Sequence, residues 1–315
     1  MKRKLLWVAA AIPVAVAAFM LYGIWNASSQ LLFPVWRGVT KDFKFCDAEA
    51  EAHWGKACGN LRLTQEFKFS EVEIPTAMGH ALPGWWVKAA DQGYASATGV
   101  ILLVHGGGSD RREMTHHIAF LLKAGFDVLS FDFSCHGEAP CPMPGLTYGE
   151  RESRDVLVAY RFLAARYRNV YALGSSVGAA AVLMALPEMP GLAAAIVENP
   201  FLSFERLISD APQAKEAPKI FVRLMMSLAM WRGKFGSMPG PEVTMRSGNV
   251  PVFFIHAQGD AVIPQNHSAR LAEIYPGPKA TWFPEAGGHG TVHEANPKDY
   301  EKRVADFLRL QGVKP

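Results

Sequence analysis

Hydrophobic and polar positions follow two different patterns along this chain. Residues Glu66–Ile74 alternate polar and apolar side chains, which predicts a half-buried antiparallel strand, and Ala81–Lys88 follows as its hairpin partner. Later apolar runs are short and nearly continuous, which predicts strands that are buried on both faces. These runs are Gly99–Val104, Asp127–Phe133, Val170–Leu173, Leu192–Val197, Pro251–His256 and Ala280–Phe283.

Amphipathic segments with helical periodicity separate these runs. Strands that alternate with such helices predict a mostly parallel sheet with helices on both faces, and the leading hairpin brings the sheet to about eight strands. Residues 200–249 carry no clear strand, so we expect a helical excursion or small cap there. The predicted helices are Arg111–Lys123, Tyr148–Tyr167, Val177–Leu186, Gln265–Ile274 and Pro297–Leu310.

The N-terminal segment is the most apolar part of the chain. A basic tripeptide at positions 2–4 precedes an uncharged run over residues 5–36, in which Leu5–Trp25 is strongly apolar. About 20 such residues are enough to cross a bilayer as a helix. A cleavable signal peptide has a shorter apolar stretch and small residues before its cleavage site. Cleavage after Ala27 would place Trp25 at the −3 position, which disfavours it.

We therefore expect residues 1–36 to form an uncleaved signal anchor and residues 37–315 to form the catalytic domain. A cleaved signal peptide and a buried helix are the alternatives. The basic residues before the span should stay in the cytoplasm, which would place the domain in the periplasm or another extracytoplasmic space.

The composition excludes several classes of protein. Of 315 residues, 50% are hydrophobic and 19% are charged, which excludes a disordered chain, a coiled coil and a collagen-like fibre. The net charge of +3 equals the charge of the basic tripeptide, so the remainder of the chain sums to zero. A nucleic-acid-binding domain would carry a basic face. We expect no nucleic-acid partner, and the sequence does not indicate the oligomeric state.

Four cysteines form two local couples, Cys46 with Cys58 and Cys135 with Cys141. Other pairings are possible, but we expect these two disulfides if the domain is exported to an oxidising environment. Zinc ligands are usually two to four residues apart with histidine nearby, which these cysteines do not match. We expect no metal and no cofactor.

The sequence Gly174-Ser175-Ser176-Val177-Gly178 is a G-x-S-x-G motif between a predicted strand and a predicted helix. In this context the motif predicts a nucleophile elbow, a sharp turn that exposes one serine. The register selects Ser176, because Ser175 would require glycines at positions 173 and 177. A glycine–serine turn without chemistry is the alternative.

His105-Gly106-Gly107-Gly108 directly follows another predicted strand. A glycine-rich loop at this place can lend a backbone amide to a developing oxyanion. We expect Gly107 to be the donor, with Gly108 as second choice, and the amide of Val177 to be its partner. A phosphate-binding loop is excluded because neither G-x-G-x-x-G nor a G-K-[ST] ending is present. We expect His105 to hold the loop in place.

From Gly99 to the C-terminus the chain resembles the α/β-hydrolases. The branch it resembles most is a membrane-anchored abhydrolase-domain group that includes depalmitoylases and small serine esterases. The segment Ser134-Cys135-His136-Gly137 departs from that group, which usually has an Arg-Gly or similar pair before the His-Gly. The resemblance rests on LLVHGGG, FDFSCHGEA, YALGSSVGAAAV, FFIHAQGDAVIP and EAGGHGTVHEANPKDYEKRVADFL.

The resemblance implies a catalytic triad in the chain order Ser, Asp or Glu, His. Asp260 follows one predicted strand and His289 follows the last, so both lie past the carboxyl end of a strand, as Ser176 does. His293 is the alternative base, and Asp132 and Glu285 are alternative acids. His116, His117 and His267 lie on predicted helices and are expected to be surface or capping residues rather than metal ligands.

Together these residues predict a serine hydrolase that cleaves a carboxylic ester or thioester through an acyl-enzyme on Ser176. A serine peptidase of the same fold and a non-catalytic hydrolase-like binding protein are the alternatives. The expected substrate is a small-molecule or lipid-like ester. The methionine-rich segment Phe221–Trp231 is either a helix buried on the sheet or a wall of an acyl pocket or membrane-facing surface.

Overall fold

An eight-stranded sheet forms the centre of the molecule, with strand order β1-β2-β4-β3-β5-β6-β7-β8. The computed structural model describes residues 2–33, 46–143 and 145–312. β1 and β2 pair antiparallel, β2 pairs antiparallel with β4, and the remaining neighbours are parallel, as the sequence predicts. The strands are β1 Ser70–Pro75, β2 Ala81–Val87, β3 Gly99–Val104, β4 Phe126–Phe131, β5 Val170–Ser175, β6 Leu192–Glu198, β7 Val252–Ile255 and β8 Lys279–Trp282.

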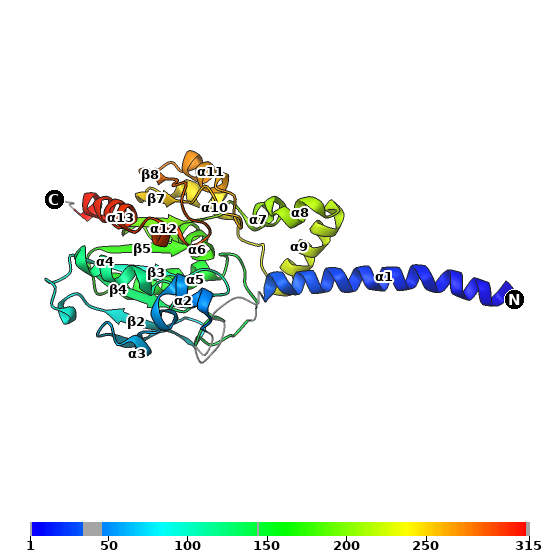
Figure 1. Cartoon of the computed structure of the whole chain (residues 1–315), viewed down its shortest axis with the longest axis horizontal. Helices are drawn as coiled ribbons and strands as arrows, with labels where there is room; N and C mark the ends of the chain where they lie inside the picture. The colour runs from blue at the N-terminus through cyan, green and yellow to red at the C-terminus, as the bar shows by residue number, and fades with distance from the viewer. Residues whose placement is uncertain (1, 34–45, 144, 313–315) are drawn as a thin grey trace.

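Helices cover both faces of the sheet (Figure 1). Val100, Leu102 and Val104 of β3 point to one face, where α5, α6 and α11 pack, and Ile101 and Leu103 point to the other, where α4 and α13 pack. This period of two with burial on both sides explains the nearly continuous apolar run. The helices of these layers are α4 Ile118–Lys123, α5 Glu152–Ala164, α6 Val177–Ala185, α11 Asn266–Ile274 and α13 Pro297–Gly312.

Short helices connect and extend these layers. Several of them consist of a single turn, including the 3₁₀ helices η1 to η5. These short helices are α2 Ala48–Trp54, η1 Lys56–Gly59, α3 Leu61–Thr64, η2 Ala90–Gln92, η3 Thr115–His117, η4 Leu186–Glu188, α10 Pro241–Thr244, η5 Met245–Ser247 and α12 Val292–Ala295.

The predicted helix Arg111–Lys123 is wrong over its first half. Turns occupy residues 111–114, η3 follows, and only the last six residues form α4. The reason is a buried ion pair: the Arg111 guanidinium and backbone amide both bind the Asp132 carboxylate, and Arg112 pairs with Asp110. These fixed arginines hold the backbone in turns that sequence periodicity cannot anticipate.

Residues 200–249 contain helices and no strand. In addition to α10 and η5, they form α7 Phe204–Asp210, α8 Pro212–Glu216 and α9 Lys219–Gly233. The Phe221–Trp231 segment lies in α9, which does not pack on the sheet as one alternative expected. It packs instead against α7 and α1, with Val222, Met226 and Ala229 buried (Figure 1).

The first helix, α1 Lys2–Leu32, extends away from the sheet, and its final turns contact α9 (Figure 1). Arg232 of α9 donates to Ser28 and Ser29 and lies over the ring of Trp25. The α1 residue Leu32 is buried, and its carbonyl accepts from the amide of Leu146.

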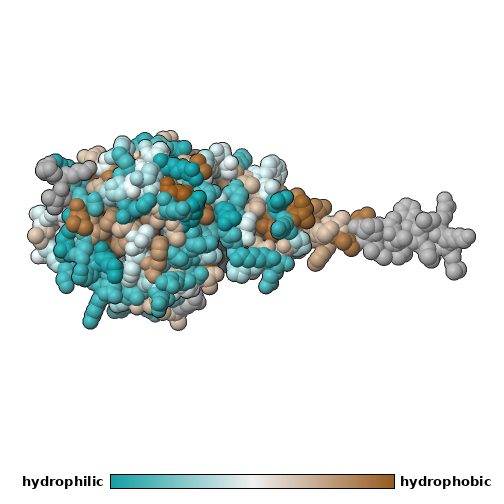
Figure 2. All heavy atoms as spheres, turned by 90° about the horizontal axis from the view of Figure 1, so that it is seen from above, coloured by the Kyte–Doolittle hydropathy of each residue, from teal (hydrophilic) through white to brown (hydrophobic). Residues whose placement is uncertain are grey.

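The structure does not confirm the expected signal anchor. Within the residues searched, no helix is both long enough and apolar enough to cross a membrane. Four polar residues follow directly after the apolar part of α1, namely Asn26, Ser28, Ser29 and Gln30. Figure 2 shows apolar side chains gathered where α1 meets the body. The boundary expected after residue 36 lies outside the described residues.

Both expected cysteine pairs are bonded. Cys46–Cys58 has an S–S distance of 2.08 Å and Cys135–Cys141 one of 2.11 Å. The first bond ties the segment before α2 to η1, and the second closes the loop after β4. The local connectivity predicted from the sequence is thus present.

Candidate active site

Ser176 stands at a sharp turn between β5 and α6. Its backbone has φ 54° and ψ −117°, a conformation that L-residues rarely adopt. A Cβ on Gly178 would lie 2.3 Å from the carbonyl oxygen of Val104, and a Cβ on Gly174 would lie 2.8 Å from the carbonyl carbon of Gly178. Only glycine fits at either position, which explains why the motif has its two glycines.

Three side chains from three loops form one hydrogen-bonded series at the carboxyl ends of the strands. His289 Nε2 lies 3.0 Å from Ser176 Oγ, and His289 Nδ1 lies 2.8 Å from Asp260 Oδ2. The structure thus brings together the serine, acid and histidine that the sequence proposed. This series allows a proton to move from the hydroxyl to the imidazole while the carboxylate orients the ring.

The Asp260 carboxylate is fully buried and has four partners. Its Oδ1 accepts the amides of Val262 and Ile263, each at 2.8 Å, and its Oδ2 contacts His256 Nε2 at 3.1 Å in addition to His289. Burial by itself would raise the pKa of Asp260, but the hydrogen bonds from His256 and His289 outweigh burial and lower this pKa. The carboxylate therefore stays ionised beside the imidazole.

The glycine-rich loop lies directly beside the serine. A Cβ on Gly106 would be 3.5 Å from Ser176 Cβ, and a Cβ on Gly107 would be 2.7 Å from the Val177 side chain. The Gly106 amide donates to the Glu113 carboxylate at 3.1 Å, so it is engaged within the loop. His105 accepts from the amide of Phe133 at 3.1 Å, which confirms that it holds the loop in place.

The alternative residues lie elsewhere. His293 contacts Glu301 at 3.3 Å and faces His116 and His117. Asp132 binds Arg111 and accepts the backbone amides of Arg111 and Glu138, so its carboxylate supports the loop structure and does not contact His289. Glu285 is exposed on the surface. His267, expected on the surface or at a cap, is buried and contacts Asp210 at 3.3 Å.

Sequence reasoning missed two residues of this region. His256 is buried at the end of β7, where Ser268 and the Ile263 carbonyl hold its ring against Asp260. The sequence could have indicated His256, because this histidine directly precedes the turn that carries Asp260. Glu113 had no such signal, since it was assigned to a helix. Burial raises the pKa of Glu113, whose carboxylate faces the loop and His289.

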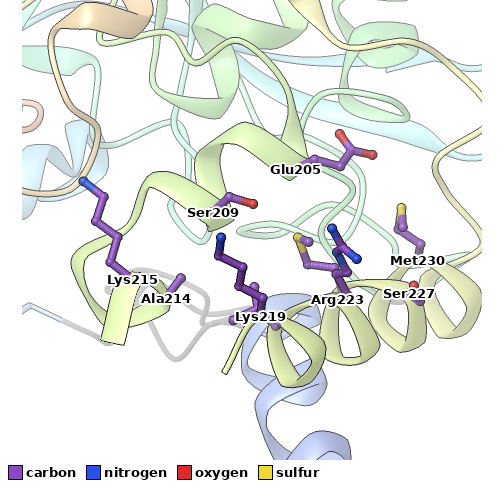
Figure 3. A pocket seen from close by; sticks show the side chains of 10 residues that line it. Glu205, Ser209, Ala214, Lys215, Lys219, Arg223, Ser227 and Met230 are labelled. Carbon is purple, nitrogen blue, oxygen red and sulfur yellow. The ribbon is translucent and has the colours of Figure 1, made fainter. Parts of the chain in front are cut away.

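A cavity of about 670 Å³ opens between α7, α8 and α9 (Figure 3). Val222, Met226 and Met230 give it an apolar wall, and Lys215, Lys219 and Arg223 add positive charge. Val222 and Met226 belong to the same apolar cluster as Val177. This cluster, also formed by Leu32, Leu146 and Tyr148, connects the cavity wall to the residue that follows Ser176; we call it the cap cluster.

Comparisons with known proteins agree with this architecture. The protein YqkD of Bacillus subtilis, described as uncharacterized, is 24% identical over 241 residues, which cover 75% of this chain and 77% of that protein. The esterase Pf2001 of Pyrococcus furiosus has a TM-score of 0.62 at 20% identity and covers 78% of this chain and 94% of its own.

The acylaminoacyl peptidase of Pyrococcus horikoshii has a TM-score of 0.56 at 16% identity, and the match covers 80% of this chain and 43% of that enzyme. Structures this dissimilar in sequence show a shared fold alone, and they do not confirm the membrane-anchored branch. Residues 101–303 match the model of the family described as "Alpha/beta hydrolase family". Because this match spans most of the chain, the protein belongs to the alpha/beta hydrolase family.

Proposed function

We propose that this protein is a serine esterase that cleaves a small-molecule carboxylic ester through an acyl-enzyme on Ser176. The observation that carries the proposal is the hydrogen-bonded series Ser176–His289–Asp260, with its serine on a strained turn. A binding protein would need neither the strain nor the buried carboxylate.

In the proposed reaction Ser176 Oγ attacks the ester carbonyl while His289 Nε2 takes the hydroxyl proton. The imidazolium is stabilised by Asp260, which the hydrogen bonds from His256 and two amides hold in its orientation. His289 then gives the proton to the leaving alcohol. In the second half water attacks the acyl carbonyl while His289 takes a proton from it. The bond to Ser176 Oγ then breaks, His289 returns the proton to Oγ, and the acid is released.

The amides of Val177 and Gly107 are proposed to hold the oxyanion of the tetrahedral intermediate. Val177 begins α6, whose N-terminal amides point toward the turn and carry the positive end of the helix dipole. Gly107 is the first glycine of the loop beyond Gly106, whose amide already binds Glu113. Contact between Gly107 and the Val177 side chain brings these two backbone segments together.

The acyl group is proposed to bind in the cavity between α7, α8 and α9. Val222 and Met226 of its apolar wall pack in the cap cluster with Val177, the residue after Ser176, and this shared packing supports the assignment. Methionines suit this role because their flexible side chains adapt to varied shapes. This arrangement favours esters of apolar acids, and a thioester with the same acyl group would fit the same site.

A fluorophosphonate probe combined with a series of p-nitrophenyl esters tests the proposal. The purified protein should be labelled covalently and should hydrolyse esters of apolar acids, and Ser176→Ala should lose both properties. Ser175→Ala is the matched control, because it removes a hydroxyl from the neighbouring position and should retain both. Labelling of Ser176→Ala, or turnover of peptide substrates in place of esters, would contradict the proposal.

A further inference from the structure

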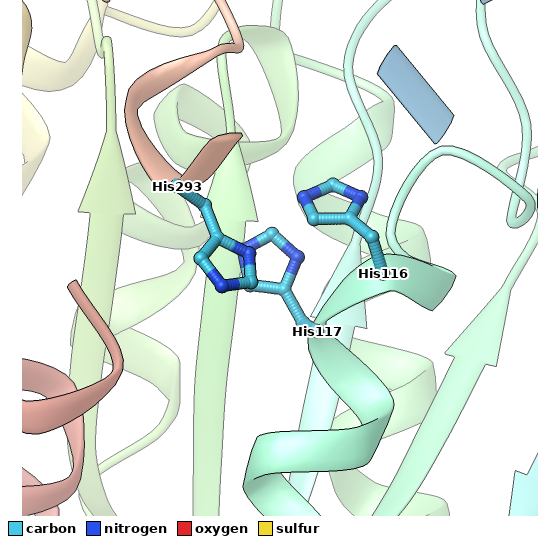
Figure 4. Close-up of side chains that lie close together, drawn as sticks. All are labelled: His116, His117 and His293. Atoms are coloured by element: carbon cyan, nitrogen blue, oxygen red, sulfur yellow. The ribbon is translucent and has the colours of Figure 1, made fainter. Parts of the chain in front are cut away.

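Three histidines that the esterase mechanism does not use lie close together in the structure. His116 and His117 lie on η3 and His293 lies on α12 (Figure 4). One ligand atom from each lies within 4.8 Å of the corresponding atoms of the other two. Residues 116 and 293 are far apart in sequence, so the fold itself creates this cluster.

Several polar atoms of this cluster lack a well-aligned hydrogen-bond partner. Nδ1 of His116, Nδ1 of His117 and Oε1 of Glu198 are buried and make no well-aligned hydrogen bond, although the two rings interact with the carbonyls of Glu113 and Met114 and the Glu198 carboxylate with Tyr300. The Glu198 side chain is 7% exposed, and its Oε1 lies 3.9 Å from His117 Nε2. Because buried polar atoms in folded proteins nearly always have a well-aligned partner, three such atoms in one cluster favour a ligand site at this place.

The surroundings of His117 match those of a metal ligand. Its Nε2 lies 3.0 Å from the hydroxyl of the buried Tyr300, so Nδ1, whose only other neighbour of this kind is the Met114 carbonyl, is the nitrogen we assign as ligand atom. Ligating histidines usually engage their second nitrogen in such a hydrogen bond, which fixes the orientation of the ring. Glu198 supplies a nearby negative charge to balance a cation.

We propose that His116, His117 and His293 bind a divalent transition-metal ion of the zinc class, with Glu198 as the neighbouring carboxylate. Imidazole nitrogens suit Zn²⁺, which binds them at about 2.0–2.1 Å. A tetrahedral site then needs nitrogens roughly 3.4 Å apart, so the three rings, whose ligand atoms lie within 4.8 Å of one another, would rotate toward the ion on binding.

The ion would connect two segments that shape the active site. α12 begins three residues after His289, and η3 follows the loop that contains Gly107 and Glu113. The carbonyl of Glu198 accepts the amide of Ser176 at 2.8 Å. A metal bound here would hold the histidine loop, the glycine loop and the strand end beside the nucleophile in one arrangement.

The test is Zn²⁺ binding to the untagged, chelator-treated protein at pH 7, measured by calorimetry and by metal analysis after dialysis. We expect one Zn²⁺ per chain and a rise in melting temperature of roughly 5 °C at saturating metal. His116→Gln and His293→Gln should each weaken binding at least tenfold. His116 is only partly buried, so this variant should fold even if His293→Gln does not.

His53→Gln is the control. This histidine lies near the cluster and pairs with Glu294 at the surface, so its loss tests for non-specific binding by exposed imidazoles. It should keep the wild-type affinity for Zn²⁺. The proposal is overturned if the protein retains no stoichiometric Zn²⁺, if His116→Gln binds as tightly as the wild type, or if His53→Gln loses affinity equally. All of these measurements report metal binding and are independent of the esterase activity.

Discussion

His289 lies on a loop and His293 lies four positions later on α12, yet their surroundings differ in kind. Both nitrogens of His289 are engaged, one by Asp260 and one by Ser176. Beside His293, the neighbouring histidines 116 and 117 each have one buried nitrogen that makes no well-aligned hydrogen bond. The series at His289 defines a direction for proton transfer, whereas the cluster at His293 is the site at which we propose that a metal ion binds.

The largest expected effect concerns the nucleophile. Ser176→Ala should lower kcat for ester hydrolysis by roughly 10⁵–10⁶-fold, because the group that forms the acyl-enzyme is absent. Steady-state kinetics with a p-nitrophenyl ester measure this effect, and circular dichroism checks the fold. If Ser176→Ala keeps full activity, the Ser176–His289–Asp260 series does not catalyse the reaction.

The comparison itself is tested by removing each histidine in turn. His289→Ala should cost about as much kcat as Ser176→Ala, since base and nucleophile act as one unit. His293→Ala should keep ester hydrolysis within about tenfold, because its ring does not contact the series. Parallel kinetics and Zn²⁺ titrations of both variants separate the two roles. An inactive His293→Ala beside an active His289→Ala would reverse the assignment.

Asp260→Asn should reduce kcat by about 10⁴-fold, a smaller loss than in Ser176→Ala or His289→Ala. The amide would still contact His289 Nδ1, but it would favour the wrong tautomer and could not stabilise the imidazolium. Single-turnover kinetics with a fluorogenic ester measure the loss. Wild-type kcat in this variant would show that the buried carboxylate serves only the fold.

A smaller effect is expected at the cavity. Ser227→Trp places a large ring into the space between α7, α8 and α9, so kcat/KM should fall about tenfold for long-chain esters and little for acetate. Leu224→Trp is the matched control, because this side chain lies on the same helix but does not line the cavity. Equal losses for acetate and long-chain esters would place the acyl site elsewhere.

The smallest effect is a pH dependence of stability. Since folding lowers the pKa of Asp260, its ionised form stabilises the fold above the unfolded pKa of about 3.9, and this contribution fades as the pH falls through the folded pKa. The difference in unfolding free energy between wild type and Asp260→Asn should therefore shrink between pH 6 and pH 3. Urea unfolding at both pH values measures it, and a constant difference would contradict the expected linkage.

The sequence allowed prediction of those features that depend on local pattern. Apolar runs located six of the strands and the alternating hairpin located the other two, and Gly174 and Gly178 marked the elbow because each has a contact that only glycine permits. The order of Asp260 and His289 along the chain followed from the family resemblance. In each case one short segment carried the signal.

Features that depend on distant contacts could not be predicted. The turns at 111–114 exist because Arg111 reaches Asp132 across the fold, and a helical pattern gives no warning of that pair. His116 and His117 resembled surface residues because the third histidine comes from a segment far along the chain. The position of α9 could not be predicted because α9 packs against α1, and the sequence pattern of α1 predicts a membrane anchor and no partner helix.

The end of α1 has a practical meaning for anyone who shortens this protein. Leu32 packs in the cap cluster with Leu146, and Leu146 touches the place where Gly107 would carry a side chain. Tyr148 donates its hydroxyl hydrogen to the carbonyl of Leu31. Cutting the chain after this helix would therefore remove part of the wall beside the glycine loop, and the trimmed enzyme would present a different pocket from the full chain.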